Sequence, residues 1–159
     1  MGTIIPGSSG GRAGTLIQKA TEKDLAGILA IQEGNFDPPW TRSMLESSLE
    51  HPRAVLRVAR KGDDLAGYSI STFAADECEL LSIAVLNTHR RQGIASALND
   101  DLRREALGRG ATQIFLEVRP SNQGARSFYA SMGYQEVATR KGYYQDGEDA
   151  LILKLNLEG

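Results

Sequence analysis

The sequence contains few residues of the types that build metal centres and nucleophilic triads. Among its 159 residues there are one cysteine, Cys78, and two histidines, His51 and His89. A single cysteine excludes an internal disulfide framework and any cysteine-rich zinc site. Two histidines make a histidine-based metal site or a Ser-His-Asp triad a weak prospect, so we expect no metal cofactor.

Charge and hydropathy argue against two further classes of protein. Eighteen Lys and Arg face 20 Asp and Glu, for a net charge of −2, so the basic excess of a duplex-binding protein is absent. The sequence has no run of about 18 apolar residues of the kind that spans a membrane. Its length, with 41% hydrophobic and 24% charged residues, is ordinary for one soluble domain. We expect a cytoplasmic protein with no nucleic-acid or membrane partner.

The first fourteen residues differ in composition from the rest. They contain five of the 17 glycines, and such a stretch predicts a flexible leader over residues 1–14, followed by one domain over residues 15–157. A formal G-x-S-x-G runs from Gly7 to Gly11 around Ser9. That motif marks a nucleophile only between a strand and a helix, so we interpret it as a chance match.

Apolar periodicity and turn residues predict a mixed α/β domain, in the order β-α-α-β-β-β-α-β-α-β-β, with a mixed sheet flanked by about four helices. A first helix should begin after the cap residue Thr21. The other predicted helices are Arg42–Glu50, Ile94–Leu107 and Ala125–Met132. The predicted strands are Thr15–Ala20, Ala54–Arg60, Leu65–Phe73, Leu80–Val85, Gln113–Val118, Tyr134–Thr139 and Ala150–Leu155.

One strand–turn–helix segment has features of an anion site. The strand ending at Val85 leads through a turn containing Gly93 into the helix at Ile94. Free N–H groups at a helix start bind phosphate, and glycine lets the backbone approach an anion closely. Arg90 and Arg91 add positive charge. Neither a P-loop nor a G-x-G-x-x-G is present, so an ordinary turn with surface arginines remains an alternative.

A second segment carries candidate acid–base groups. Glu117 lies in an apolar strand between Leu116 and Val118, which suits a general base, although the periodicity alone favours simple alternation onto the solvent face. Asn122 precedes a helix and could merely cap it. Tyr129 follows two helical turns later, where a Phe-Tyr pair is usually part of a core.

These two segments together resemble a known family. Arg90-x-x-Gly93-x-Ala95, after Ile83-Ala84-Val85, resembles the acetyl-CoA pyrophosphate loop of the GNAT N-acetyltransferases. The pattern E-V-R-x-S-N-x-x-A-x-x-F-Y-x-x-x-G-Y, from Glu117 to Tyr134, is similar to the ribosomal-protein alanine N-acetyltransferase branch of that family. The resemblance extends from about Leu16 to Leu155.

The resemblance implies a mostly antiparallel mixed sheet, splayed where acetyl-CoA binds. Main-chain amides from Arg91 to Ser96 would hold the pyrophosphate, and Ile83–Val85 would pair with the pantetheine arm. The Val85 amide would lie near the thioester carbonyl, where an oriented donor stabilises an oxyanion. The implied cofactor-binding residues are Ile83, Ala84, Val85, Arg90, Arg91, Gln92, Gly93, Ile94, Ala95, Ser96, Asn122 and Tyr129.

The resemblance also implies roles in the reaction. Glu117 would be the general base and Tyr129 the general acid for direct attack of an amine on the thioester. Because no covalent intermediate is needed, Cys78 need not be a nucleophile, and its neighbours Glu77 and Glu79 should keep its thiol pKa normal or raised.

The substrate implied by the resemblance is the N-terminal alanine of a small-subunit ribosomal protein. Trp40, Tyr143 and Tyr144 would border its peptide, although Trp40 could equally be a core anchor and only one of the adjacent tyrosines should touch substrate. A small-molecule amine acetyltransferase, an archaeal-type broad N-terminal acetyltransferase and a non-catalytic acyl-CoA-binding module remain alternatives.

Overall fold

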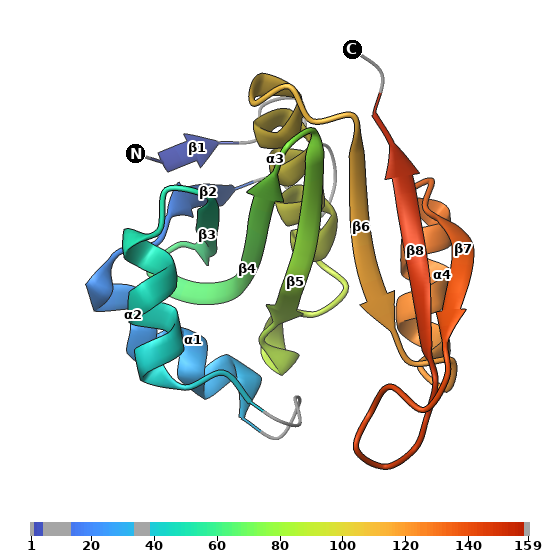
Figure 1. Ribbon diagram of the computed structural model, residues 1–159. Coiled ribbons are helices and arrows are strands. Elements are labelled where there is room, and N and C mark those ends of the chain that lie inside the picture. Colours follow the sequence, from blue (N-terminus) through green and yellow to red (C-terminus); the bar gives the residue numbers. More distant parts are fainter. Residues whose placement is uncertain (1, 5–13, 34–38, 158–159) are drawn as a thin grey trace.

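The computed structural model describes residues 2–4, 14–33 and 39–157, and Figure 1 shows their arrangement. Within these residues the chain forms one sheet of eight strands with four α-helices. The strands are β1 (Gly2–Ile4), β2 (Thr15–Lys19), β3 (Ala54–Lys61), β4 (Asp64–Ala74), β5 (Glu77–Val85), β6 (Gln113–Val118), β7 (Gln135–Arg140) and β8 (Ala150–Asn156). The helices are α1 (Leu25–Gln32), α2 (Arg42–Glu50), α3 (Ile94–Gly108) and α4 (Gln123–Ser131).

The sheet has the strand order β1-β2-β3-β4-β5-β6-β8-β7, and every pair is antiparallel except β5 with β6. Helix α3 connects these two parallel strands, as a parallel pair requires. The pairing of β5 with β6 covers only Glu77–Glu79 against Gln113–Phe115. Beyond it the two strands diverge toward their carboxyl ends (Figure 1). The predicted mixed, mostly antiparallel and splayed sheet is therefore confirmed.

The helices cover both faces of the sheet. Leu25 and Ile28 of α1 and Leu45 of α2 pack with Val58 and Tyr68 in one core cluster. On the opposite face α3 contributes to two other clusters, and one of these continues to Tyr129 of α4. Strands β6, β7 and β8 therefore carry helices on one face, and β7 is exposed along its whole length.

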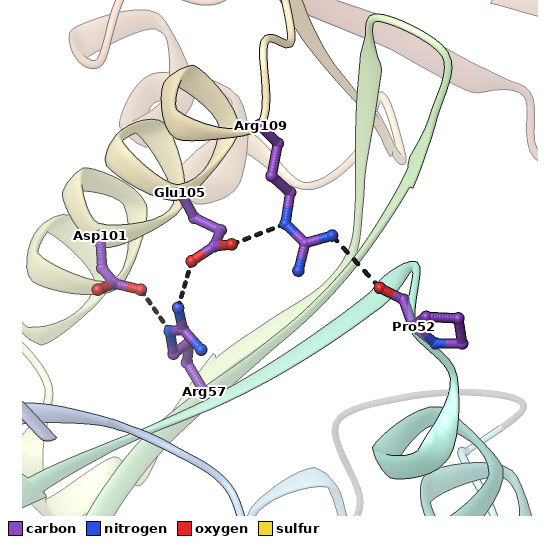
Figure 2. Close-up of polar contacts among 5 residues, drawn as sticks. All are labelled: Pro52, Arg57, Asp101, Glu105 and Arg109. Carbon is purple, nitrogen blue, oxygen red and sulfur yellow. Dashed lines mark hydrogen bonds and ion pairs between the residues drawn. The ribbon is translucent and has the colours of Figure 1, made fainter. Parts of the chain in front are cut away.

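Helix α3 is tied to the sheet by a network of charged side chains, which Figure 2 shows. Arg57 of β3 donates from Nε to Asp101 Oδ2 at 2.9 Å and from Nη2 to Glu105 Oε1 at 2.6 Å. Arg109 donates from Nε to the other oxygen of Glu105 at 2.7 Å and from Nη1 to the Pro52 carbonyl at 3.3 Å. Burial would raise the pKa of Glu105, but the bonds and charges of Arg109 and Arg57 outweigh it and lower the pKa.

The first helix does begin after Thr21, with a 3₁₀ turn at Glu22–Asp24, and the Thr21 amide donates to Asp24 Oδ2 at 2.9 Å. The prediction of a flexible leader over residues 1–14, by contrast, is wrong for Gly2–Ile4. These residues form β1, which pairs with β2 from Gln18 to Leu16. Residues 5–13, with the formal Ser9 motif, lie outside the described residues.

Candidate functional site

A cavity of about 840 Å³ lies where β5 and β6 diverge. From Ser82 to Val85, β5 pairs with β4 on one side, while the residues paired with β6 end at Glu79. The free side of this segment can therefore receive an extended ligand in the manner of an added strand. Among the predicted site residues the cavity is lined by Ile83, Ala84, Val85, Arg90, Arg91, Gly93, Ile94, Ala95, Ser96, Glu117, Asn122, Tyr129 and Tyr144.

One end of this cavity is the N-terminus of α3. Its cap residue Gly93 has φ of 77°, and Arg91 has φ of 65°, which is uncommon for a residue with a side chain. The first amides of a helix have no partner within it and carry partial positive charge. Arg90 and Arg91 line the same end, and Arg90 Nε lies 3.5 Å from the Val85 carbonyl oxygen. This end has the charge and the free donors that fit a pyrophosphate.

Glu117 lies on the other wall, at the carboxyl end of β6. Its neighbours Leu116 and Val118 are buried in the core with α3 and α4, so alternation turns Glu117 toward the opposite face of the sheet. Its side chain is 20% exposed, and Oε2 lies 3.5 Å from Arg140 Nη1. A hydrogen bond to Glu117 raises the pKa of the Tyr143 hydroxyl.

Glu117 is also accessible from a second, smaller cavity of about 330 Å³. That cavity includes Glu79, Phe115, Arg140 and Ile152. Burial, with the nearby charge of Glu117, raises the pKa of Glu79, while Arg140 acts in the opposite direction. Because Glu117 lines both cavities, its side chain can be reached from either side.

Tyr129 reaches the large cavity from α4. It is buried, and its ring meets the edges of Phe128 and Tyr134 with centroids 5.2 and 5.3 Å away. Burial raises the pKa of Tyr129, so its hydroxyl stays protonated near neutral pH. Asn122 both lines the cavity and caps α4, because its Oδ1 accepts from the Ala125 amide at 3.0 Å.

Three predicted site residues are not among those that line the large cavity: Gln92, Trp40 and Tyr143. Trp40 packs against the core cluster of α1 and α2, and Gln32 accepts a hydrogen bond from its amide at 3.1 Å. This placement supports the core-anchor alternative for Trp40. Tyr143 is 47% exposed, and its ring meets that of Tyr144 edge to face at 5.1 Å.

Three further side chains belong to the site but were not singled out from the sequence: Glu79, Arg119 and Arg140. Arg119 could have been identified from the sequence, since it falls inside the pattern that begins at Glu117. Glu79 and Arg140 could not have been identified in this way, because their nearness to Glu117 depends on how β5, β6 and β7 are placed in the sheet.

Cys78 is buried, and burial raises its thiol pKa to about 12, as expected for a cysteine that is not a nucleophile. Across residues 2–4, 14–33 and 39–157 there is no cluster of three or more His, Cys, Asp or Glu side chains suited to a metal ion. No helix in the described part of the chain has the length and apolar character needed to cross a membrane.

Comparisons with known proteins identify a family and relatives with the same fold. Residues 25–134 match the model of the acetyltransferase (GNAT) family. The [ribosomal protein bS18]-alanine N-acetyltransferase of Escherichia coli strain K12 is 33% identical over 135 residues, which cover 83% of this chain and 90% of that protein.

Two solved structures have the same fold. The crystal structure of the ribosomal-protein-S18-alanine N-acetyltransferase from Escherichia coli has a TM-score of 0.81 and 31% identity, over 91% of this chain and 95% of that one. Ard1 from Thermoplasma volcanium has a TM-score of 0.85 over 92% of this chain and 100% of that one. Its 21% identity supports the fold alone.

Proposed function

Because the chain belongs to the acetyltransferase (GNAT) family, we propose that it transfers the acetyl group of acetyl-CoA to the N-terminal α-amine of a protein, specifically the N-terminal alanine of a small-subunit ribosomal protein. The observation that carries this proposal is the opening between β5 and β6, which has a helix N-terminus at one end and Glu117 on one wall. The ribosomal substrate rests on relatives above 30% identity that carry that activity in their names.

For the cofactor, each part of the opening has a matching chemical group. The α3 N-terminus and Arg90 and Arg91 suit the pyrophosphate. The free edge at Ile83–Val85 suits the pantetheine arm, which has amide groups that pair like a strand. The Val85 amide is our candidate donor to the thioester carbonyl, where negative charge develops as the amine attacks.

Glu117 is our candidate general base. A free α-amine has a pKa of about 7.7–8.0, so about 9–17% of it is neutral at pH 7, and one carboxylate suffices to take its proton. As the new C–N bond forms and the C–S bond breaks, that proton passes from nitrogen to Glu117. The second cavity supports this role, because it offers the amine a route to Glu117 from the side away from the cofactor.

Tyr129 is our candidate donor to the departing sulfur. A thiol has a reference pKa near 8.5, below the raised pKa of Tyr129, so full proton transfer to a solvated thiolate is uphill. A thiolate among the same apolar rings also has a raised pKa. We therefore assign to Tyr129 a hydrogen bond to the sulfur that strengthens as the C–S bond breaks, with its proton passing to the sulfur and being restored to Tyr129 from solvent when CoA leaves.

The test is release of free CoA from acetyl-CoA in the presence of peptides that differ only in their first residue. Turnover should be fastest with N-terminal alanine. Equal rates for all first residues would favour the broad archaeal-type activity. Turnover on small amines such as polyamines, with none on any peptide, would refute the proposal.

The residue roles are tested by Glu117→Gln and Tyr129→Phe, each expected to lower kcat by about 100-fold or more with little change in acetyl-CoA affinity. The matched controls are Glu136→Gln, which pairs with Arg126 on the surface, and Tyr134→Phe, whose hydroxyl bonds Asn99 in the core. Both controls should keep the wild-type kcat. Full rate in Glu117→Gln and Tyr129→Phe would remove both role assignments.

A further inference from the structure

The segment between β7 and β8, residues 141–149, is connected to the turn after β6 by Arg119 and by the Ser121 amide. Arg119 follows β6 directly, and its Nη1 donates to Asp146 Oδ2 at 2.8 Å and to Glu148 Oε1 at 3.0 Å. The other oxygen of Glu148 accepts from the Ser121 amide at 2.9 Å. Two neighbouring carboxylates of the segment are therefore bound to residues just beyond Glu117.

The same arginine lies against Tyr144. Its Cζ is 3.9 Å from the centre of the Tyr144 ring, a distance at which a guanidinium is attracted to an aromatic face. Tyr144 and Arg119 both line the large cavity together with Glu117 and Tyr129. The Tyr144 ring therefore packs against Arg119 as well as against the ring of Tyr143.

The segment has one further attachment on this side, the hydrogen bond between the Tyr143 hydroxyl and Glu117. Within the segment, the Tyr144 amide donates to the Glu148 carbonyl at 3.0 Å and the Gly147 amide to the Tyr144 carbonyl at 2.8 Å. Its base is closed by Asp149, which accepts from the Gly142 amide at 2.9 Å and pairs with Lys141 at 3.2 Å. These internal contacts shape the segment, but they do not attach it to the cavity wall.

The ionisation of Asp146 and Glu148 favours a stable attachment of the segment to Arg119. Hydrogen bonds from Ser121 and then from Arg119 lower the pKa of Glu148, against a smaller effect of burial. The pKa of Asp146 is lowered first by the Glu148 amide and also by Arg119. Both carboxylates are therefore ionised at neutral pH, where they bind the guanidinium most strongly.

We propose that Arg119 is a positioning residue for the peptide substrate: it holds the 141–149 segment so that Tyr144 stands beside Glu117 as one wall of the peptide site. The proposal rests on the function proposed above. Arg119 acts through Tyr144, so its loss should weaken peptide binding and leave both the cofactor site and the chemistry largely intact. A planar guanidinium suits this position, because it can lie flat on an aromatic ring while its N–H groups donate in its own plane.

The kinetic test compares Arg119→Gln with Arg126→Gln. Arg126 is a close control, since its side chain is also 30% exposed and also makes a double contact to a glutamate, Glu136, but it does not line the cavity. Arg119→Gln should raise the peptide KM about tenfold and change kcat and the acetyl-CoA KM by less than about twofold. Arg126→Gln should change none of the three. Equal effects of Arg119→Gln on both KM values would overturn the proposal.

A double-mutant cycle with Tyr144 separates positioning from general loosening. If Arg119 acts through Tyr144, then Tyr144→Ala alone should raise the peptide KM about tenfold, and adding Arg119→Gln should raise it no more than about threefold further. Independent roles would multiply instead, to about a hundredfold. A multiplied effect would overturn the proposal.

Limited trypsin digestion tests the attachment without any substrate. Cleavage after Lys141, which is exposed within the segment, should be several-fold faster in Arg119→Gln than in the wild type or in Arg126→Gln. Equal cleavage rates would overturn the proposal. If no peptide is acetylated by the wild type, the proposed function fails, and this digestion alone then decides whether Arg119 holds the segment.

Discussion

The network in Figure 2 makes a quantitative prediction about how α3 is held to the sheet. In Arg57→Met the apolar stem is kept, but Asp101 and Glu105 lose their shared cation. The Asp101 side chain is 7% exposed and that of Glu105 is 26% exposed. Both charges therefore remain in places that water reaches poorly.

The magnitude follows from this burial. Removing one partner of a fully buried ion pair costs about 3–5 kcal/mol. Here Glu105 keeps its bond from Arg109 at 2.7 Å and is partly solvated, so we expect a loss of about 2–3 kcal/mol. For a chain of this size that is a fall in Tm of about 4–12 °C.

The assay is urea unfolding followed by circular dichroism, with Arg42→Met as the control. Arg42 and Glu46 are both 49% exposed, and such a surface pair is worth less than about 1 kcal/mol. A loss in Arg57→Met no larger than that in the control would refute the reasoning.

The pH dependence gives a second check on the same variant. Because Arg109 and Arg57 lower the pKa of Glu105 in the folded state, this group stabilises the fold above its unfolded pKa of about 4.3. That contribution is lost as the pH falls through the lower, folded value. The stability difference between wild type and Arg57→Met should therefore shrink below about pH 4.

Two other predictions concern backbone packing and the thiol. A Cβ at Gly67 would lie 2.9 Å from the Ala84 carbonyl oxygen, so Gly67→Ala should cost about 1–3 kcal/mol and weaken acetyl-CoA binding in calorimetry by displacing β5. Gly108→Ala, where the added atom meets nothing within 4 Å, should do neither, and equal behaviour of the two variants would contradict this. Cys78 is buried with a thiol pKa of about 12, so it should resist iodoacetamide at pH 8 and react in denaturant. Rapid labelling of the native protein would show that the thiol is accessible.

Elements with strong local signals were predictable from the sequence. Helix α2 has the expected bounds Arg42–Glu50, and β6 has the expected bounds Gln113–Val118. Strand β5 begins earlier than predicted, at Glu77 in place of Leu80. Glu77 and Glu79 face the open side of the sheet, so they interrupt the apolar run although their backbone pairs with β4.

The candidate site, too, was predictable only where its residues are adjacent in sequence. Contiguous segments such as Arg90–Ser96 could be identified, because turn, helix start and charge are adjacent in sequence. The contacts of Arg119 with Tyr144 and of Arg140 with Glu117 could not, because they join residues more than 20 positions apart in sequence that only the fold brings together. The roles of Glu117 and Tyr129 stay predictions until the kinetic variants are measured.

Opening the sheet in its middle gives the molecule inner edges in addition to the outer edges β1 and β7. Unpaired backbone groups on an outer edge are a hazard, since another chain can add to them and begin aggregation. The inner edge along β5 has the same groups, but it lies in a cavity bordered by side chains of α3 and α4. A strand of another protein is part of a larger sheet and is too bulky to enter this cavity, whereas a thin ligand with amide groups can enter it. The fold can therefore keep unpaired backbone groups along β5 without exposing them to other chains.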